Sequence, residues 1–389
     1  MCPVSLFNAA PIVTNQYCVV HFSEDFDSTG ARIAPKIRDY LAHNEFNFHK
    51  ARLLGDILQY SASNLSNSEI IQKIDLVDHL QQFYSRNPKP EILNGIRFIA
   101  THKIATGGQG VVLLARREGE EEDGNRYVLK IPLSVKKTHL KRTLYEYMLQ
   151  QHAYSLLKGT CTVPEPIGLI KKRIGTSEAY IQVGRFQAMY PGATASIQLV
   201  DAMRHHRRCP LLTIRQWRDV CLSLITAFET LQANDIYHND IKPNNILLRF
   251  YENNVEPVII DFGLASRSNN HMWCKNADGT ISFKRKRTEE ERLRDVPYIC
   301  PILCQQKNPI PTCDLFSVVY MIEGVATCVQ LPTIASYCDM YVQYNPLARP
   351  GFQEVFDVMK KYFHAELHGG VVVEEREGNV MSYTVSKGK

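Results

Sequence analysis

The sequence has no long uninterrupted hydrophobic run and no N-terminal export signal. Its longest apolar stretch, Leu315 to Leu331, contains Glu323 and is shorter than the roughly 20 apolar residues that a membrane span needs. The N-terminus has no basic segment, and Asn8 and Asn15 interrupt its apolar residues. We therefore expect an intracellular protein, cytoplasmic or nuclear, that makes no contact with a membrane.

The sequence also lacks a strong charge imbalance and a metal-type cysteine pattern. A net charge of +5 over 389 residues is far from the dense basic stripe of a nucleic-acid binder, so we expect no direct nucleic-acid partner. The eleven cysteines are scattered. Cys300 and Cys304 form the nearest pair, but no second Cys or His pair follows at ligand spacing. Reduced thiols are the expectation.

The order of patterns along the chain predicts an α+β fold with two lobes. From Arg97 onward, β-rich runs such as 111–115 and 127–131 dominate. Helical periodicity follows at 141–157 and, after a Thr213 cap, through Leu231. A strand-rich half followed by a helix-rich half predicts a small β-rich lobe and a larger helical lobe.

The flanks of this region carry no catalytic motif. A helix is expected from Ser66-Asn-Ser68 to before the prolines at 88 and 90. We place an N-terminal extension at 1–95, a catalytic domain at 96–363 (lobes at about 96–190 and 191–363) and a polar, loose tail at 364–389.

The most informative segment is 236–248. It places His238, Asp240, Lys242 and Asn245 within eight residues, between an amphipathic helix and an apolar strand. A second apolar strand ends in Asp261, twenty-one residues after Asp240. Two carboxylates and an amide at strand ends form a plausible Mg²⁺ site, because this ion prefers a few hard oxygen ligands plus phosphate oxygens. We interpret His238 as a core residue beneath the loop.

A glycine-containing turn lies upstream, at 105–110, between two predicted strands. Such a turn can lie over a nucleotide's phosphates because backbone N–H groups approach them closely, although a purely structural turn is an equal alternative. Lys130 follows on the next strand, where it can supply a fixed positive charge for the α- and β-phosphates of a nucleotide.

These motifs together resemble the protein kinase family, whose order is glycine loop, strand lysine, catalytic loop and Asp-Phe-Gly. The resemblance covers about 98–363 and implies ATP and Mg²⁺ as cofactors and a protein substrate with a Ser or Thr acceptor. Asp240 would accept the substrate proton, Lys242 would neutralise the moving phosphoryl group, and Asn245 and Asp261 would hold magnesium. The implied nucleotide-binding residues are Ala105, Gly107, Gly108, Gly110, Val112, Val128, Lys130, its helix partner Glu146, and Leu247.

Four positions depart from the family's pattern. Ala105 replaces the first glycine, and Val128 replaces the usual alanine beside the adenine. Asn239 replaces the arginine that receives an activation-segment phosphate, so we expect activity that does not depend on this phosphate. Ile302 replaces the glutamate that would pair with Arg349. The divergent flanks are similar to those of kinases from large DNA viruses.

Two other classes remain open. A pseudokinase scaffold would keep the fold and bind nucleotide or partners without turnover. A small-molecule phosphotransferase shares the His-x-Asp loop but generally lacks Lys242-Pro243 and the Phe-Gly after the magnesium Asp. The basic run Lys284–Arg287 is consistent with a solvated loop, a substrate-docking patch or a nuclear localisation signal.

Overall fold

The computed structural model describes residues 75–80, 89–106, 110–120, 127–132, 137–157, 162–174, 177–185, 193, 195–206, 210–268, 288–304, 312–343, 345–368, 370–377 and 380–387. The chain divides into two compact units. Unit 1 comprises Met1–Lys136 and Ile170–Ile181, and unit 2 comprises Lys137–Leu169 and Gln182–Lys389. Within the described ranges, no helix combines the length and apolarity needed to cross a bilayer.

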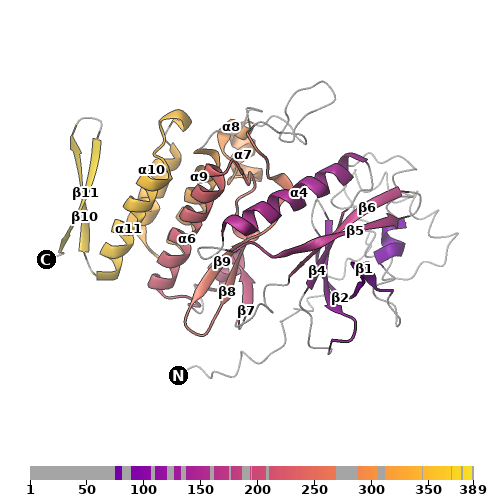
Figure 1. Cartoon of the computed structure of the whole chain (residues 1–389). Helices are drawn as coiled ribbons and strands as arrows, with labels where there is room; N and C mark the ends of the chain where they lie inside the picture. Colours follow the sequence, from indigo (N-terminus) through magenta and orange to yellow (C-terminus); the bar gives the residue numbers. More distant parts are fainter. Residues whose placement is uncertain are drawn as a thin grey trace, which may run out of the picture. The chain divides into compact units, whose positions relative to one another are not determined.

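Unit 1 is built on a six-stranded sheet in the order β1-β2-β3-β4-β6-β5 (Figure 1). The strands are β1 (Glu91–Leu93), β2 (Ile96–Thr106), β3 (Gly110–Arg117), β4 (Tyr127–Pro132), β5 (Pro166–Ile174) and β6 (Ser177–Arg185). The central strands β3 and β4 have an alternating pattern of burial. Val111, Leu113, Leu129 and Ile131 are fully buried, while the residues between them on β4 stay partly exposed. Side chains on a strand alternate between faces, so one face of the sheet forms the core.

Two elements of unit 1 lie within the segment that the sequence assigns to the extension. Residues 75–80 are helical, and the sheet begins at Glu91, before the predicted boundary at 96. Glu91 is 2% exposed and accepts hydrogen bonds from Lys172 Nζ at both oxygens, at 2.9 Å. His79 Nε2 lies 3.5 Å from the same carboxylate. The helix 75–80 therefore lies against the buried Glu91–Lys172 ion pair that joins β1 to β5.

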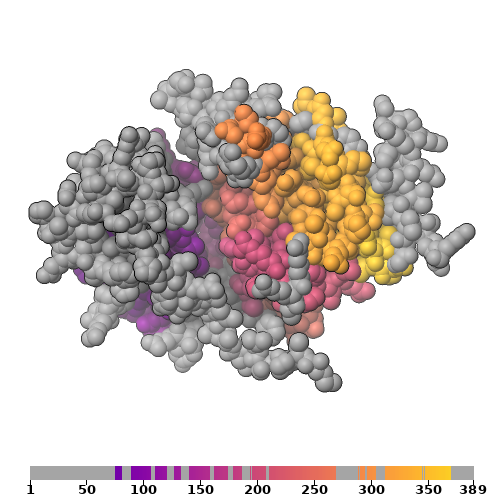
Figure 2. Space-filling view, turned by 180° about the vertical axis from the view of Figure 1, so that it is seen from behind, coloured from indigo at the N-terminus to yellow at the C-terminus, as the bar shows by residue number. Residues whose placement is uncertain are grey.

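Unit 2 contains most of the helices and two small sheets. Its helices are α4 (Lys137–Leu156), α5 (Leu199–His206), α6 (Ile214–Ala233), α7 (Glu289–Asp295), α8 (Pro301–Cys304), α9 (Thr312–Cys328), α10 (Pro332–Gln343) and α11 (Phe352–His368). A three-stranded sheet has the order β7-β8-β9, from Ala195–Gln198, Ile246–Phe250 and Val255–Ile259. On the face shown in Figure 2, helices α9 to α11 (orange to yellow) form a continuous surface.

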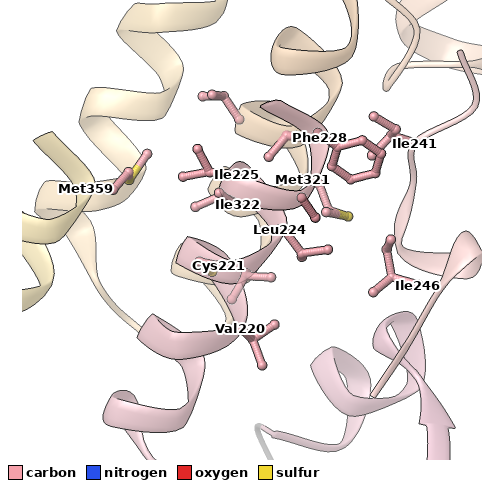
Figure 3. Close-up of a cluster of buried hydrophobic side chains, with 14 of the residues drawn as sticks. Val220, Cys221, Leu224, Ile225, Phe228, Ile241, Ile246, Met321, Ile322 and Met359 are labelled. Atoms are coloured by element: carbon pink, nitrogen blue, oxygen red, sulfur yellow. The ribbon is translucent and has the colours of Figure 1, made fainter. Parts of the chain in front are cut away.

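Helix α6 lies at the centre of the core of unit 2. It begins at the predicted cap, because the Thr213 hydroxyl accepts from Gln216 N–H and the Gln216 side chain accepts from Thr213 N–H. Its apolar face packs against Met321 and Ile322 of α9 and Met359 of α11 (Figure 3). The same cluster includes Ile241, which lies within the 240–245 segment, and Ile246, which directly follows it. Burial of these two apolar side chains thus anchors the predicted catalytic loop.

The end of the chain corrects the expected loose tail. Residues Gly370–Glu377 (β10) and Val380–Lys387 (β11) form an antiparallel hairpin that contacts α11 (Figure 1). The pairing runs without a register shift from Gly370↔Lys387 to Glu377↔Val380. The polar composition hid β-branched runs on either side of Gly378-Asn379, a dipeptide typical of two-residue hairpin turns.

Candidate active site

Three of the predicted nucleotide-binding residues form a row across the sheet of unit 1. The register places Ala105 of β2 opposite Val112 of β3, and Val112 opposite Lys130 of β4. Directly opposed residues of antiparallel strands share a face, and Val128 lies on the same face, two residues before Lys130. All four are partly or fully exposed, on the face opposite the buried core of these strands.

Gly110 has a structural reason to be glycine. A Cβ at this position would lie 2.7 Å from the carbonyl oxygen of Ile131, a distance too short for a carbon–oxygen contact without a shift of the backbone. Close packing of β3 on β4 therefore requires glycine here, whether or not the turn also lies over phosphates. Gly107 and Gly108 lie outside the described residues.

The predicted partner of Lys130 is a buried acid. Glu146 is 6% exposed on α4, a helix that begins at Lys137 and covers the predicted periodic segment. Lys130 belongs to unit 1 and Glu146 to unit 2, so their pairing stays a prediction. Leu247 lies on β8, paired with Val258 of β9, and is half-buried.

Asp314 holds the backbone of the predicted catalytic loop. This carboxylate is 2% exposed and accepts backbone N–H groups of His238 at 2.7 Å and Asn239 at 2.9 Å. Burial raises the pKa of Asp314, and the nearby His238 and the two backbone donors oppose that rise. His238 is fully buried, as expected for a core residue, and its Nε2 lies 3.1 Å from the carbonyl oxygen of Ile260.

Three predicted catalytic residues converge on one carboxylate. Oδ2 of Asp240 accepts from Lys242 Nζ at 2.7 Å and from Asn245 Nδ2 at 2.9 Å. Asn245 Nδ2 also donates to the Asp240 carbonyl oxygen at 2.8 Å. Among the described residues, no group donates to the second carboxylate oxygen, Oδ1. The side chain of Asp240 is therefore oriented by two donors and retains a free acceptor.

Asp261 is placed beside Asn245 by a β-hairpin. β8 begins directly after Asn245, β9 ends two residues before Asp261, and Ile246 pairs with Ile259. The N–H of Ile260 donates to the carbonyl oxygen of Asn245 at 3.0 Å. Asp261 has φ 65°, a left-handed conformation that Asp and Asn tolerate better than most residues.

The donor set fits Mg²⁺. Because the Asn245 amide nitrogen is committed to Asp240, its oxygen is available as a ligand. An amide oxygen and the Asp261 carboxylate are the hard ligands that Mg²⁺ takes in small number, with phosphate oxygens and water completing the shell.

Asn239 makes contacts that sequence reasoning missed. It has φ 61°, and its Nδ2 donates to the carbonyl oxygens of Tyr237 (3.2 Å) and Leu264 (3.1 Å) and to Ser266 Oγ (2.9 Å). Tyr237 and Ser266 also exchange backbone hydrogen bonds at 2.9 and 2.8 Å. The position that lost the arginine thus connects the catalytic loop to the residues after Asp261. The sequence signal for this conformation was the residue type, because Asn adopts positive φ more readily than most residues.

Arg142 is a second residue that the sequence did not single out. From α4, its Nε and Nη2 both donate to the Gly263 carbonyl oxygen, at 3.1 and 2.9 Å. This bidentate contact connects α4, the helix of Glu146, to the 3₁₀ turn Phe262–Leu264 that follows Asp261. In sequence, Arg142 is one of several basic residues on a helix, and nothing marks it.

Residues 288–304 include the end of the segment from Asp261 to Ile302, which the resemblance to protein kinases implies as the activation segment. Thr288, a candidate phosphate acceptor, is the N-cap of α7: its hydroxyl accepts from Glu291 N–H, and Glu291 accepts from Thr288 N–H. Thr280, Ser282 and the basic run Lys284–Arg287 lie outside the described residues. Ile302 is buried in an apolar cluster with Leu303 and Phe316.

The fold and this site define a class of protein. Unit 1 is β-rich and presents Lys130 in a row with Ala105 and Val112. Unit 2 is helical and contains the Asp-x-Lys-x-x-Asn loop beside an Asp-Phe-Gly turn. Together these features are those of the bilobal α+β protein kinase fold, as predicted.

Comparison with known proteins agrees with that class. The protein kinase domain family matches residues 186–328. The chain is 24% identical over 239 residues to Serine/threonine-protein kinase PknA of Nostoc sp., covering 59% of this chain and 37% of that protein. It is 22% identical over 260 residues to a Dictyostelium discoideum protein described as a probable serine/threonine-protein kinase, covering 58% and 37%. A 60-residue stretch, 15% of this chain and 20% of the relative, is 37% identical to Myosin light chain kinase A of Dictyostelium discoideum.

The chain therefore spans just over a third of the length of the first two of these curated relatives. The match of residues 186–328 to the protein kinase domain family supports the same class.

Proposed function

We propose that this protein is an ATP- and Mg²⁺-dependent kinase that transfers the γ-phosphate to Ser or Thr hydroxyls of proteins without needing a phosphate on its own activation segment. The observation that supports this most is the Asp240 carboxylate, oriented at Oδ2 by Lys242 and Asn245 and free at Oδ1. A pseudokinase has no need of this arrangement.

Each residue has a defined part in the transfer. Oδ1 of Asp240 accepts the proton of the substrate hydroxyl, whose oxygen bonds to the γ-phosphorus as the bond to the ADP oxygen breaks. Lys242 neutralises charge on the phosphoryl oxygens, and Lys130 holds the α- and β-phosphates. Mg²⁺, held by Asn245 and Asp261, supplies charge neutralisation when bound. Positioning and electrostatic stabilisation of this kind provide most of the catalysis.

Independence from phosphate rests on Asn239. In its place an arginine would need an anion to connect the loop to the activation segment. The Asn239 amide makes this connection with neutral hydrogen bonds to Leu264 and Ser266. No charge needs to arrive before the link forms.

The test uses purified, phosphatase-treated protein with Mg²⁺, labelled ATP and a peptide library containing Ser, Thr or Tyr acceptors. We expect label on Ser and Thr peptides, and loss of at least about 100-fold in the Asp261→Ala variant. Label on Tyr peptides alone would contradict the acceptor class. Nucleotide binding by the wild type with no transfer to any peptide would favour the pseudokinase.

A further inference from the structure

Arg349 is a buried cation in the segment between α10 and α11. The residue is 8% exposed, and its guanidinium carbon lies 4.5 Å from the centre of the Phe316 ring of α9. Its Nη2 donates to the Val342 carbonyl oxygen at 3.3 Å. Its Nε is buried and has no hydrogen-bond partner among the described residues. The guanidinium thus stacks on an aromatic ring and makes a hydrogen bond to a carbonyl oxygen, but neither contact supplies a negative charge.

The described part of the chain offers Arg349 no carboxylate. The ion pairs of the structure do not include it, and Ile302, where a glutamate would be expected, is 8% exposed within an apolar cluster. A buried charge without a counter-ion costs several kcal/mol, so an uncompensated guanidinium here would destabilise the fold. The geometry requires an anion of another kind.

Cys300 lies at the right place for this role. It precedes α8, is fully buried, and its Sγ accepts from Arg349 Nη1 at 3.6 Å. The pKa of Cys300 is about 7, below its ordinary 9.0. A hydrogen bond from the Cys313 thiol and the nearby Arg349 lower this pKa, and burial opposes them. The other titratable or charged groups around this cluster are Tyr341, Arg292, Tyr298 and Tyr320. The carboxylate of Glu354 acts on Tyr341, and those of Glu323 and Asp339 act on Tyr320, but none of the three forms an ion pair with Arg349 among the described residues.

We propose that the thiolate of Cys300 is the counter-ion of Arg349, so that a Cys–Arg ion pair fixes the residues before α8 to the segment that precedes α11. Cys300 is then a positioning residue: it contacts no substrate and acts through Arg349. Loss of the thiolate leaves a buried, unpaired guanidinium.

The pair makes stability depend on pH in a defined direction. An acid whose pKa is lowered in the folded protein contributes fully above its ordinary pKa, and this contribution is lost as the pH falls through the folded value. For a folded pKa of about 7 and an ordinary 9.0, the folding equilibrium constant should rise about 100-fold from below pH 7 to above pH 9.

The first experiment replaces Cys300 with a matched charged and neutral pair. Cys300→Asp and Cys300→Asn have nearly the same volume and differ in charge, so the proposal predicts that the Asp variant is the more stable in urea unfolding. Cys221 is the control, because it is a fully buried thiol whose pKa is raised by burial to about 12 and which lies in the apolar core. At Cys221 the order must reverse, with Asn more stable than Asp. Equal stabilities at Cys300, or Asn above Asp, would overturn the proposal.

A second measurement covers the case in which these variants do not fold. Thiolate absorbance of the folded wild type and of Arg349→Lys and Arg349→Met is followed between about pH 6 and pH 8.5. The proposal predicts that one thiolate forms with a midpoint near 7 in the wild type and in Arg349→Lys, and that Arg349→Met shifts it upward. An unchanged midpoint in Arg349→Met would overturn the pairing. The stability and absorbance results stand whether or not the protein transfers phosphate.

Discussion

Single side chains decide how the catalytic loop is held. Asp314 satisfies two backbone donors of the loop, and Asn239 connects the same loop to Leu264 and Ser266. In the family's usual pattern, the residue at position 239 is an arginine that pairs with a phosphate on the activation segment. Here the short Asn239 amide, at positive φ, donates directly to Leu264 and Ser266 instead.

Replacing Asn239 should impair turnover even when no phosphate is present. Asn239→Gly keeps the positive φ and removes three Nδ2 contacts. At about 0.5–1.5 kcal/mol per hydrogen bond, we expect about 2 kcal/mol less stability and roughly tenfold slower transfer. Urea unfolding and peptide phosphorylation measure both effects. A Gly variant as active as the wild type would show that the amide link is dispensable.

His79 should make unit 1 less stable in acid. Burial, and to a lesser degree Lys172, lowers its pKa from 6.5 to about 4. Its 3.5 Å contact with Glu91 suggests an ion pair, but Lys172 already neutralises that carboxylate at both oxygens, so a neutral imidazole is favoured. The unfolded chain binds the proton first as pH falls, so about 3 kcal/mol of stability is lost between pH 6.5 and about 4.

The check compares urea unfolding of the wild type and His79→Asn across this range. The difference in unfolding free energy between the two proteins should change by about 3 kcal/mol. His205→Asn, at an exposed position, is the control and should track the wild type. Parallel curves for wild type and His79→Asn would contradict the buried, neutral histidine.

At the scale of elements, sequence patterns predicted what periodicity and caps determine. The helix capped by Thr213 is present because its buried face repeats at the helical period, and the apolar strands next to Asp240 and Asp261 are present as β8 and β9. The C-terminal hairpin was missed because the charged residues after Val373 and the polar residues of 380–387 gave this segment the composition of a loose tail. Contacts such as Arg142 to Gly263 join residues 121 positions apart, so no local pattern signals them.

Arg142 should couple α4 to the turn that follows Asp261. Arg142→Lys keeps the charge but cannot make the bidentate contact with the Gly263 carbonyl oxygen. We expect turnover to fall about tenfold, with a smaller change in the Michaelis constant for peptide. Steady-state kinetics of Arg142→Lys and Arg142→Ala test this. A loss in Ala that Lys fully restores would mean that charge, and not the fork geometry, matters.

Thr288 should act as a helix cap and not as a phosphate acceptor. Thr288→Ala removes the acceptor for Glu291 N–H and should cost about 1 kcal/mol of stability, whereas Thr288→Ser keeps the cap. Both variants should retain most of their transfer rate. If a folded Thr288→Ala variant lost activity while Thr288→Ser kept it, and mass analysis found phosphate on the serine, Thr288 would be a phosphate acceptor after all.

At the scale of the whole molecule, the two units carry separate halves of the predicted site. Unit 1 presents Ala105, Val112 and Lys130 in one row, and unit 2 presents Asp240, Asn245 and Asp261 around one loop and hairpin. The sequence analysis singled out both sets because their spacing matches the motifs of the protein kinase family. It did not reveal the Cys300–Arg349 contact, since the thiol and the cation meet only through packing around Phe316.

The transfer rate of wild type against Asp240→Asn tests the central claim most directly. The change removes the negative charge and the free proton acceptor while keeping the side chain's shape. The free energy of unfolding should therefore stay within about 1 kcal/mol of the wild-type value. With phosphatase-treated proteins from a kinase-free source, Mg²⁺, ATP and a Ser/Thr peptide, we predict measurable transfer by the wild type and at least about 100-fold less by the variant. Equal rates, or no transfer by the wild type, would contradict the account.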